Sequence, residues 1–308
     1  MTAMSDPMFR LAHISDIHLG PLPRITLREL ASKRITGYVN WQRNRRKRLF
    51  GNILESLLEE IKSTAPDHLA ITGDLVNLAA KAEIEVATAW LKAVGDPLSV
   101  SYVPGNHDAY VPGAYKKIYQ AWRPNMLGDD HQHRQVDDSH FPYLRVRDQM
   151  ALIGVSTAYA TPPLLASGLF GRRQARELGQ LLDETRKAGL FRTIMIHHPP
   201  VRGAAASHKR LLGIGRFARV MQDHGAELIL HGHTHLDTLY HLDGLHGSIP
   251  VVGVPSASEG PGGSKPASGY NLLTIEGDQD KWQCQLERFG LGQNGRTFDL
   301  VQSENLMQ

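Results

Sequence analysis

Short apolar runs alternate with amphipathic stretches along most of the chain. The apolar runs have the length of buried strands and cover residues 9–15, 68–72, 98–103, 150–155, 191–196 and 227–230. The amphipathic stretches repeat their apolar residues every three or four positions, as helices do, and cover residues 49–61, 82–94, 172–188 and 217–224. Because strands and helices alternate, the sequence predicts an α/β fold with a mainly parallel sheet covered by helices.

The pattern changes after residue 236, where strands follow one another without helices. These predicted strands form a meander or an antiparallel second layer and cover residues 239–242, 249–254, 270–275 and 282–289. Residues 254–269 are rich in Gly, Pro and Ser and predict a mobile loop. We find no repeat and no linker, so we expect one domain over residues 1–308. Its expected parts are a core over 9–255, an insertion over 21–50 and C-terminal strands over 270–290.

Composition narrows the class of protein. The 308 residues are 41% hydrophobic and 21% charged, which is ordinary for a globular protein with a sizeable core. The one cysteine, Cys284, excludes a disulfide framework and a multi-cysteine zinc site, and it fits a reducing compartment. We see no secretory signal and no apolar run of the ~18–20 residues that a membrane span needs. A cytoplasmic location is therefore expected.

The net charge of +3 is unevenly distributed. Residues 24–48 contain nine basic residues and one acid, Glu29. Three interpretations stay open for this basic segment: a solvated helix face, contact with the substrate, or peripheral contact with an anionic inner membrane through residues 43–50. The rest of the chain is mildly acidic, so no nucleic-acid partner is expected.

Residue types that bind metals follow the predicted strands. These clusters are Asp16-x-His18, Gly73-Asp74, Gly105-Asn106-His107-Asp108, His197-His198 and Gly232-His233-Thr234-His235. The carboxyl ends of strands in an open α/β sheet form a common crevice, so we expect the clusters to converge. Mixed carboxylate and imidazole ligands suit Mn, Fe or Zn. Seven ligands suffice for two divalent ions if one carboxylate bridges them.

The ordered blocks D-x-H, G-D, G-N-H-D, H and G-H-x-H resemble those of the calcineurin-like metallophosphoesterase family. They run from Asp16 to His235, about two thirds of the chain. With its His-His-Pro-Pro segment at 197–200, the chain is most similar to bacterial class III cyclic nucleotide and glycerophosphodiester phosphodiesterases. The resemblance implies a four-layer α/β/β/α sandwich in which a mixed, mainly parallel sheet packs on a second sheet.

The resemblance also implies the roles of individual residues. One ion would be held by Asp16, His18, Asp74 and His235, and the other by Asp74, Asn106, His197 and His233. His107 is the implied catalytic histidine facing the leaving group, and Asp108 orients the turn that carries it. Of two adjacent histidines, His197 is the expected ligand because it directly follows a strand, and His198 supports the site or faces the substrate.

One position departs from the pattern of many relatives. They carry an acid three residues after the bridging aspartate, and here that position is Asn77. An amide can orient the catalytic imidazole but cannot stabilise its cation by charge. We therefore expect His107 to be less basic than in relatives that have the acid.

The implied activity is hydrolysis of a phosphodiester by a metal-bound hydroxide, with His107 protonating the leaving alkoxide. A small cyclic nucleotide or glycerophosphodiester is the expected substrate. The main alternative is a phospholipid or lipid-linked pyrophosphate at the inner membrane surface. A nuclease and a non-catalytic scaffold are less favoured. The sequence leaves open the identity of the metals and whether the chain forms a homodimer.

Overall fold

Two six-stranded sheets pack face to face in a computed structural model, which describes residues 8–42, 51–129, 140–279 and 281–307. The first sheet has the order β14-β13-β12-β1-β2-β3. Its strands are β1 (Phe9–Ile14), β2 (His68–Ile71), β3 (Val100–Tyr102), β12 (Gly269–Glu276), β13 (Gln283–Leu291) and β14 (Phe298–Asn305). β1, β2 and β3 are parallel, whereas β12, β13 and β14 add antiparallel neighbours.

The second sheet has the order β10-β11-β9-β7-β5-β4. Its strands are β4 (Tyr143–Arg147), β5 (Met150–Val155), β7 (Phe191–Ile196), β9 (Leu228–His231), β10 (Leu239–Gly244) and β11 (Gly247–Gly253). The four inner strands are parallel, and β4 and β10 are antiparallel edges. The short strands β6 (Gly168–Leu169) and β8 (Leu211–Leu212) form a separate pair.

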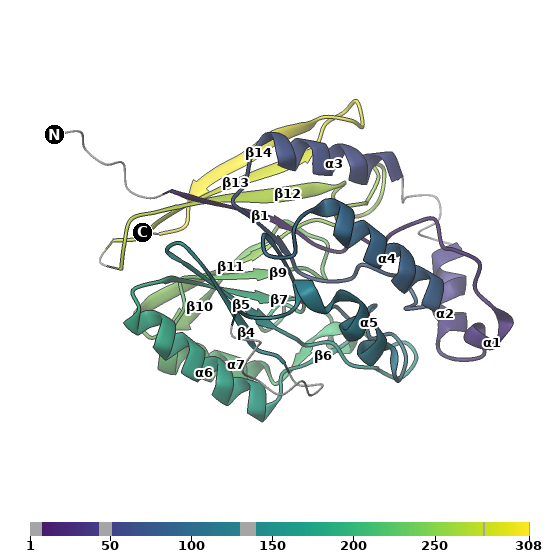
Figure 1. The fold of residues 1–308 in the computed structure, drawn as a ribbon, viewed down its shortest axis with the longest axis horizontal. Coiled ribbons are helices and arrows are strands. Elements are labelled where there is room, and N and C mark those ends of the chain that lie inside the picture. Colours follow the sequence, from purple (N-terminus) through teal and green to yellow (C-terminus); the bar gives the residue numbers. More distant parts are fainter. Residues whose placement is uncertain (1–7, 43–50, 130–139, 280, 308) are drawn as a thin grey trace.

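Helices cover the outer faces of both sheets (Figure 1). Those on the first sheet are α3 (Gly51–Ser63) and α4 (Lys81–Val94), with α5 (Ala114–Trp122) packed beside α4, and those on the second are α6 (Arg172–Lys187) and α7 (Ile214–His224). One apolar core joins the inner faces of both sheets, and a second lies under α6 and α7. The four-layer α/β/β/α sandwich predicted from the resemblance is therefore confirmed.

The late strands differ from their prediction in one respect. They do not make a layer of their own, because β10 and β11 extend the second sheet beside β9, while β12 to β14 extend the first sheet beside β1. Residues 254–268 contain no named helix or strand, as expected, but part of this loop is buried. The Ser256 hydroxyl donates to the Asp16 carbonyl at 2.6 Å, and the Ala257 amide donates to the Ser15 carbonyl at 2.9 Å.

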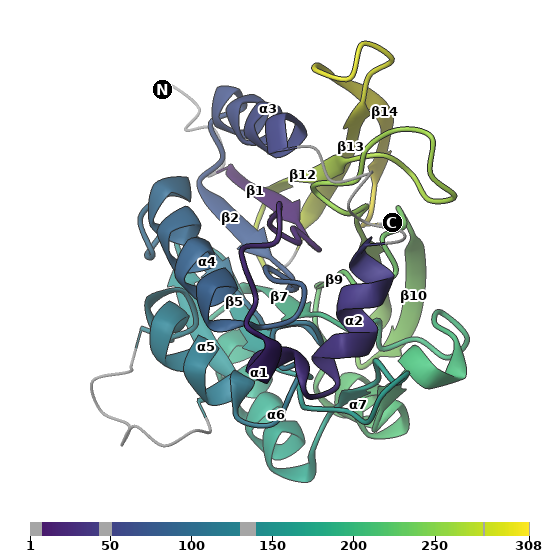
Figure 2. The same cartoon turned by 90° about the vertical axis from the view of Figure 1, so that its right-hand side faces the viewer.

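The insertion between β1 and α3 carries two short helices, α1 (Leu27–Leu30) and α2 (Arg34–Asn40). Figure 2 shows both helices in front of the ends of the central strands. Arg34 fixes α2 there, because its guanidinium donates to the carbonyls of Leu78 (2.9 Å) and Ala79 (2.7 Å). The predicted membrane-contact segment, 43–50, lies outside the described residues. No helix in the described ranges is both long and apolar enough to cross a bilayer.

Candidate metal centre

The predicted ligands lie just beyond the carboxyl ends of strands in both sheets. Asp16 and His18 follow β1, Asp74 follows β2, Asn106 follows β3, His197 follows β7, and His233 and His235 follow β9. All seven side chains are buried. Because the two sheets pack face to face, these strand ends meet at one edge of the sandwich. The expected convergence is therefore present.

The backbone at this edge is strained. Five of the seven predicted ligands have a positive φ, although none is glycine: Asp16 (53°), His18 (44°), Asp74 (58°), His233 (67°) and His235 (56°). Left-handed backbone costs a non-glycine residue of order 1–3 kcal/mol and persists only where the surroundings impose it. Such strain clusters at functional sites, so the backbone points to the same residues as the sequence blocks do.

Two groups of side chains share the carboxylate of Asp74. In one group, Asp16 Oδ1 lies 3.0 Å from His235 Nε2 and 3.8 Å from His18 Nε2. In the other, His197 Nε2 lies 3.3 Å from Asn106 Oδ1. Asp74 Oδ2 reaches both groups, at 3.9 Å from His18 Nε2 and 3.4 Å from His197 Nε2. Asp74 thus lies between two potential cation sites.

Backbone carbonyls hold the outward-facing nitrogen of three of these histidines. His18 Nδ1 donates to the Val76 carbonyl at 3.2 Å, and His197 Nδ1 donates to the Thr72 carbonyl at 2.6 Å. His233 Nε2 donates to the Lys209 carbonyl at 2.9 Å. A carbonyl on one ring nitrogen fixes the tautomer that leaves a lone pair on the other. The donor set therefore fits borderline divalent cations.

The electrostatics of the site favour bound cations. Burial by itself would raise the pKa of Asp74, but the neighbouring His197 and His107 hold it far below its ordinary value. His235 acts in the same way on Asp16, whose pKa is also lowered. Burial opposes protonation of His197, yet the carboxylate of Asp74 raises its pKa to about 9. A cation bound beside Asp74 would replace the proton that this carboxylate favours on His197.

His198 has different hydrogen-bond partners from His197. Its Nδ1 lies 2.7 Å from Thr157 Oγ1, and its Nε2 donates to the Ala166 carbonyl at 3.1 Å. Both ring nitrogens therefore contact protein atoms, although the ring also packs 4.3 Å from that of His233, centroid to centroid. Burial lowers the pKa of His198 to about 3. These contacts favour a supporting role for His198 and leave His197 as the ligand candidate.

Asp108 organises the loops that carry Asp74 and Asn106. It accepts hydrogen bonds from the backbone amides of Asp74 (2.9 Å), Leu75 (3.0 Å) and Gly105 (2.7 Å), and from the Tyr102 hydroxyl. Burial, reinforced by the charge of Asp74, raises the pKa of Asp108 to about 7. A Cβ at Gly105 would collide with the Asp74 carboxylate, so only glycine permits this close approach.

His107 lies beside the cluster and lines its cavity. Its Nδ1 donates to the backbone carbonyl of Asn77 at 2.6 Å, and its ring meets that of His18 edge-on at 4.8 Å. The Asn77 side chain donates to the Leu19 carbonyl at 3.1 Å and also hydrogen-bonds Glu83. The sequence pointed to the side chain of Asn77 as the partner of His107, but the acceptor of the Nδ1 hydrogen bond is the backbone carbonyl of Asn77.

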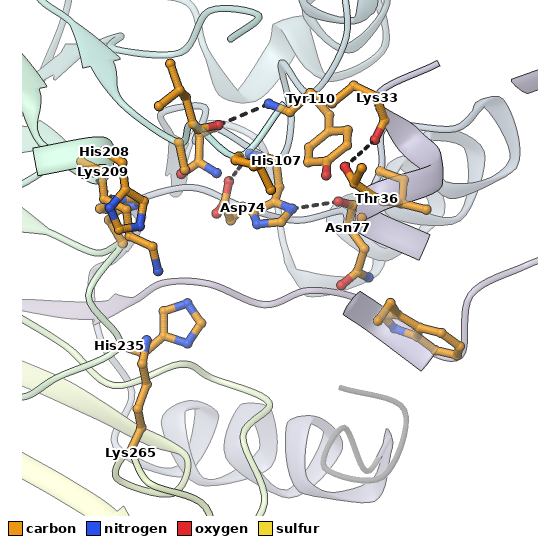
Figure 3. Close-up of a pocket in the computed structure, with 18 residues that line it drawn as sticks. Lys33, Thr36, Asp74, Asn77, His107, Tyr110, His208, Lys209, His235 and Lys265 are labelled. Carbon is orange, nitrogen blue, oxygen red and sulfur yellow. Dashed lines mark hydrogen bonds between the residues drawn. The ribbon is translucent and has the colours of Figure 1, made fainter. Parts of the chain in front are cut away.

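A cavity of about 260 Å³ opens beside the cluster (Figure 3). Besides predicted site residues, its walls include Lys33, Trp41, Tyr110, Lys209 and Lys265. Sequence reasoning did not assign these five residues to the site, because they come from separate loops outside the five blocks. The one sequence feature that pointed to such residues was the basic segment, for which contact with the substrate was one of the open interpretations. Lys33 of this segment does line the cavity.

Comparison with known proteins agrees with this geometry. The model of the calcineurin-like phosphoesterase family matches residues 9–237, which contain all five blocks. No curated protein matches the chain significantly. A dimetal phosphatase from Danio rerio is similar in structure, with a TM-score of 0.58 and 14% identity over 98% of this chain and 99% of that one.

Two larger proteins share the fold. A purple acid phosphatase from yellow lupin has a TM-score of 0.57 and 13% identity, and Haemophilus influenzae NAD nucleotidase has a TM-score of 0.52 and 10% identity. They match 98% and 97% of this chain, which spans 54% of each of them. At such identities the likeness establishes the fold alone. With the family model matched over most of its length, the chain belongs to the calcineurin-like phosphoesterase family, and it is a phosphoester hydrolase with a centre for two divalent metal ions.

Proposed function

We propose that the protein is a phosphodiesterase acting on a small anionic substrate, of the class III cyclic nucleotide and glycerophosphodiester type. The position of Asp74 between two groups of ligands carries the proposal. In the proposed assignment Asp16, His18, Asp74 and His235 would hold one ion, and Asp74, Asn106, His197 and His233 would hold the other, so that Asp74 is common to both sets.

When bound, two such ions polarise the phosphoryl group and lower the pKa of a water molecule to about 7. The chain's own residues place and protonate the substrate. His107 lines the cavity, and the Asn77 carbonyl fixes its ring through Nδ1. In the protonated form, His107 delivers a proton to the departing oxygen as general acid. Asp108 keeps the loop with Asn106 and His107 in place through its bonds to backbone amides.

The size and charge of the cavity support a small anionic substrate. Its volume of about 260 Å³ suits a small molecule. Lys33, Lys209 and Lys265 line the cavity, and Asp74 is the only acid among its described lining residues. The lipid alternative depends on residues 43–50, which lie outside the described ranges, so it stays a prediction.

The test is a screen of the purified chain after reconstitution with Mn²⁺, Fe²⁺ or Zn²⁺. The substrates are bis(p-nitrophenyl) phosphate, 3′,5′- and 2′,3′-cyclic nucleotides, glycerophosphodiesters and, on vesicles, lipid pyrophosphates. We expect metal-dependent hydrolysis of soluble diesters. Asp74→Asn should lower kcat by at least about 100-fold, because it removes the bridging charge.

Metal analysis accompanies the screen. Asp74→Asn should bind fewer ions per chain than the wild type, while Asp67→Asn, an exposed change outside the cavity, should bind as many. Activity confined to lipid pyrophosphates on vesicles would favour the lipid alternative. Full activity after complete chelation of metal would contradict the proposal.

A further inference from the structure

Lys33 belongs to the insertion and to none of the five sequence blocks. It precedes α2, and the bonds from Arg34 to the carbonyls of Leu78 and Ala79 anchor this end of the helix. The Lys33 side chain is half-buried and lines the cavity beside the proposed metal centre. The insertion thus places one fixed cation at the wall of the site.

The ammonium group of Lys33 has neutral partners. Its Nζ donates to Thr161 Oγ1 at 2.6 Å and to the Leu165 carbonyl at 3.1 Å, and it lies 4.6 Å from the centre of the Tyr110 ring. No carboxylate of the described residues forms an ion pair with it. An ammonium has three N–H donors, so these two acceptors leave one donor for a ligand.

A half-buried cation without a counter-ion is unfavourable, because burial removes water without supplying an opposite charge. The effect is visible in the pKa of Lys33, which burial lowers to about 8. An anionic group bound in the cavity would supply the missing charge. Lys33 would then be fully protonated and doubly stabilised, by the anion and by the Tyr110 face.

The position of Lys33 relative to His107 identifies which part of the substrate would meet it. Both contact the Tyr110 ring, which stacks on the His107 ring at 5.5 Å with an interplanar angle of 19° and whose centre lies 4.6 Å from Lys33 Nζ. Lys33 and Tyr110 lie on the same side of the cavity as His107, whereas Lys209 and Lys265 lie on the other side (Figure 3). The proposed function places the leaving group at His107, so Lys33 lies on the leaving-group side.

We propose that Lys33 binds an anionic group carried by the leaving group, and that the enzyme therefore prefers phosphodiesters whose leaving group bears a carboxylate or a second phosphoryl group. This inference rests on the proposed function. In the reaction, water oxygen bonds to phosphorus, the bond from phosphorus to the leaving oxygen breaks, and that oxygen takes a proton from His107. Lys33 exchanges no proton and forms no covalent bond.

The test compares three probes that share a phenyl group. Methyl phenyl phosphate has no second anionic group, methyl 3-carboxyphenyl phosphate adds a carboxylate, and P1,P2-diphenyl diphosphate adds a phosphoryl group. We compare kcat/KM of each variant with that of the wild type on the same probe, so the intrinsic reactivity of the probes cancels. The variants are Lys33→Met, Lys33→Arg and Thr161→Val.

Lys33→Met should lower kcat/KM by about 10-fold or more on the preferred anionic probe, because it removes a charge-assisted hydrogen bond. The loss on methyl phenyl phosphate should be at least about fivefold smaller, because this probe has no second anionic group for Lys33 to bind. Lys33→Arg should keep the preference, since it keeps the charge. Thr161→Val removes a neutral partner of Lys33 but not the charge, so it serves as the matched control and should also keep the preference. The ratio of losses on the two anionic probes shows whether Lys33 favours the carboxylate or the phosphoryl group.

A binding measurement excludes a merely structural role. By isothermal titration calorimetry on metal-loaded protein, 3-hydroxybenzoate or phenyl phosphate should bind about 10-fold more weakly to Lys33→Met than to Lys33→Arg. Equal losses on all three probes, or no loss on any, would overturn the inference and leave the proposed function intact. A wild type that turns over no probe, and no soluble diester in the earlier screen, would overturn both.

Discussion

The carboxylate of Asp16 and the imidazole of His235 lie 3.0 Å apart, although one follows a strand of the first sheet and the other a strand of the second. The charge of His235 lowers the pKa of the Asp16 carboxyl, against the effect of burial. This contact joins the first and last blocks of the family pattern. It also joins the two sheets directly at the candidate centre.

Removal of metal should therefore lower the thermal stability of the protein. A ligand that binds only the folded state, at a hundredfold excess over its Kd, stabilises that state by about 2.7 kcal/mol per site. We expect Tm to fall after chelation and to recover when Mn²⁺ or Zn²⁺ is restored. Differential scanning calorimetry of both forms measures the difference. Asp74→Asn serves as the control, and a chelation effect as large in this variant as in the wild type would contradict the prediction.

Loss of the Tyr102 hydroxyl should weaken the centre from a distance. This hydroxyl donates to Asp108, which holds the loops of Asp74 and Asn106. Above about pH 8, where Asp108 is ionised, Tyr102→Phe removes a hydrogen bond to a charged group and should lower the free energy of unfolding by about 1.5–3 kcal/mol. Metal affinity should fall about 10-fold or more.

Tyr143→Phe is the matched control for this change. Its hydroxyl is also buried, but it donates to the neutral Tyr102 carbonyl at 3.1 Å. Urea unfolding should show a loss of about 0.5–1.5 kcal/mol, with metal affinity unchanged. Equal metal affinity in Tyr102→Phe and the wild type would show that Asp108 holds the loops without this hydrogen bond.

Substitution of Asn77 by aspartate should destabilise the protein in a pH-dependent way. The Asn77 side chain hydrogen-bonds Glu83, a buried carboxyl whose pKa burial raises above its ordinary value. Asn77→Asp would place a second carboxylate there. The folded state then binds more protons than the unfolded state, so the stability of the variant should fall as pH rises from about 4.5.

Urea titrations of both proteins from pH 4 to pH 8 measure this difference. The gap between wild type and Asn77→Asp should widen with pH, and a gap that narrows would contradict the prediction. The pH–rate profile of the same variant tests the expectation that an acid at position 77 makes His107 more basic. An unchanged profile would show that the Asn77 carbonyl alone sets the state of His107.

The pH dependence of substrate preference should report the charge of Lys33. Its pKa is about 8, and the groups that face it are the Thr161 hydroxyl, the Leu165 carbonyl and the Tyr110 ring. Below this pH Lys33 is a cation, and above it the charge is lost. The ratio of kcat/KM for methyl 3-carboxyphenyl phosphate to that for methyl phenyl phosphate should fall above pH 8. In Lys33→Arg the ratio should stay constant up to pH 10, and a parallel fall in both proteins would assign the effect to another group.

The bounds of several elements could be predicted because their apolar residues in the sequence are the residues that the fold buries. The strands 150–155 and 191–196 have the predicted bounds, since both are mostly apolar and buried along their whole length. The strand 298–305 was not predicted. It lies at the edge of the sheet and most of its side chains are exposed, so it has no pattern of buried apolar residues. The short helices at 27–30 and 34–40 were obscured by the basic residues around them.

The convergence of the candidate ligands could be predicted from sequence, because they follow strands whose carboxyl ends meet at one edge. The contacts that support these residues could not be predicted. Carbonyls such as those of Val76 and Lys209 accept hydrogen bonds from the candidate histidines, and any residue type supplies a carbonyl, so no sequence pattern marks them. The place of Lys33 in the cavity wall could not be predicted for a related reason. Its contacts are with Tyr110 and Thr161, which are distant from it in the chain.

Under the proposed assignment, each ion takes ligands from both sheets, with His235 completing one set and His197 and His233 completing the other. The ions would then act as cross-links between the two sheets, which are otherwise joined by a shared apolar core and by buried contacts such as those of Arg288 with the Gly253 and Thr238 carbonyls. A small shift of one sheet relative to the other would move the ligands of one sheet away from those of the other. Substitutions deep between the sheets, at residues that contact no ligand, would then lower activity.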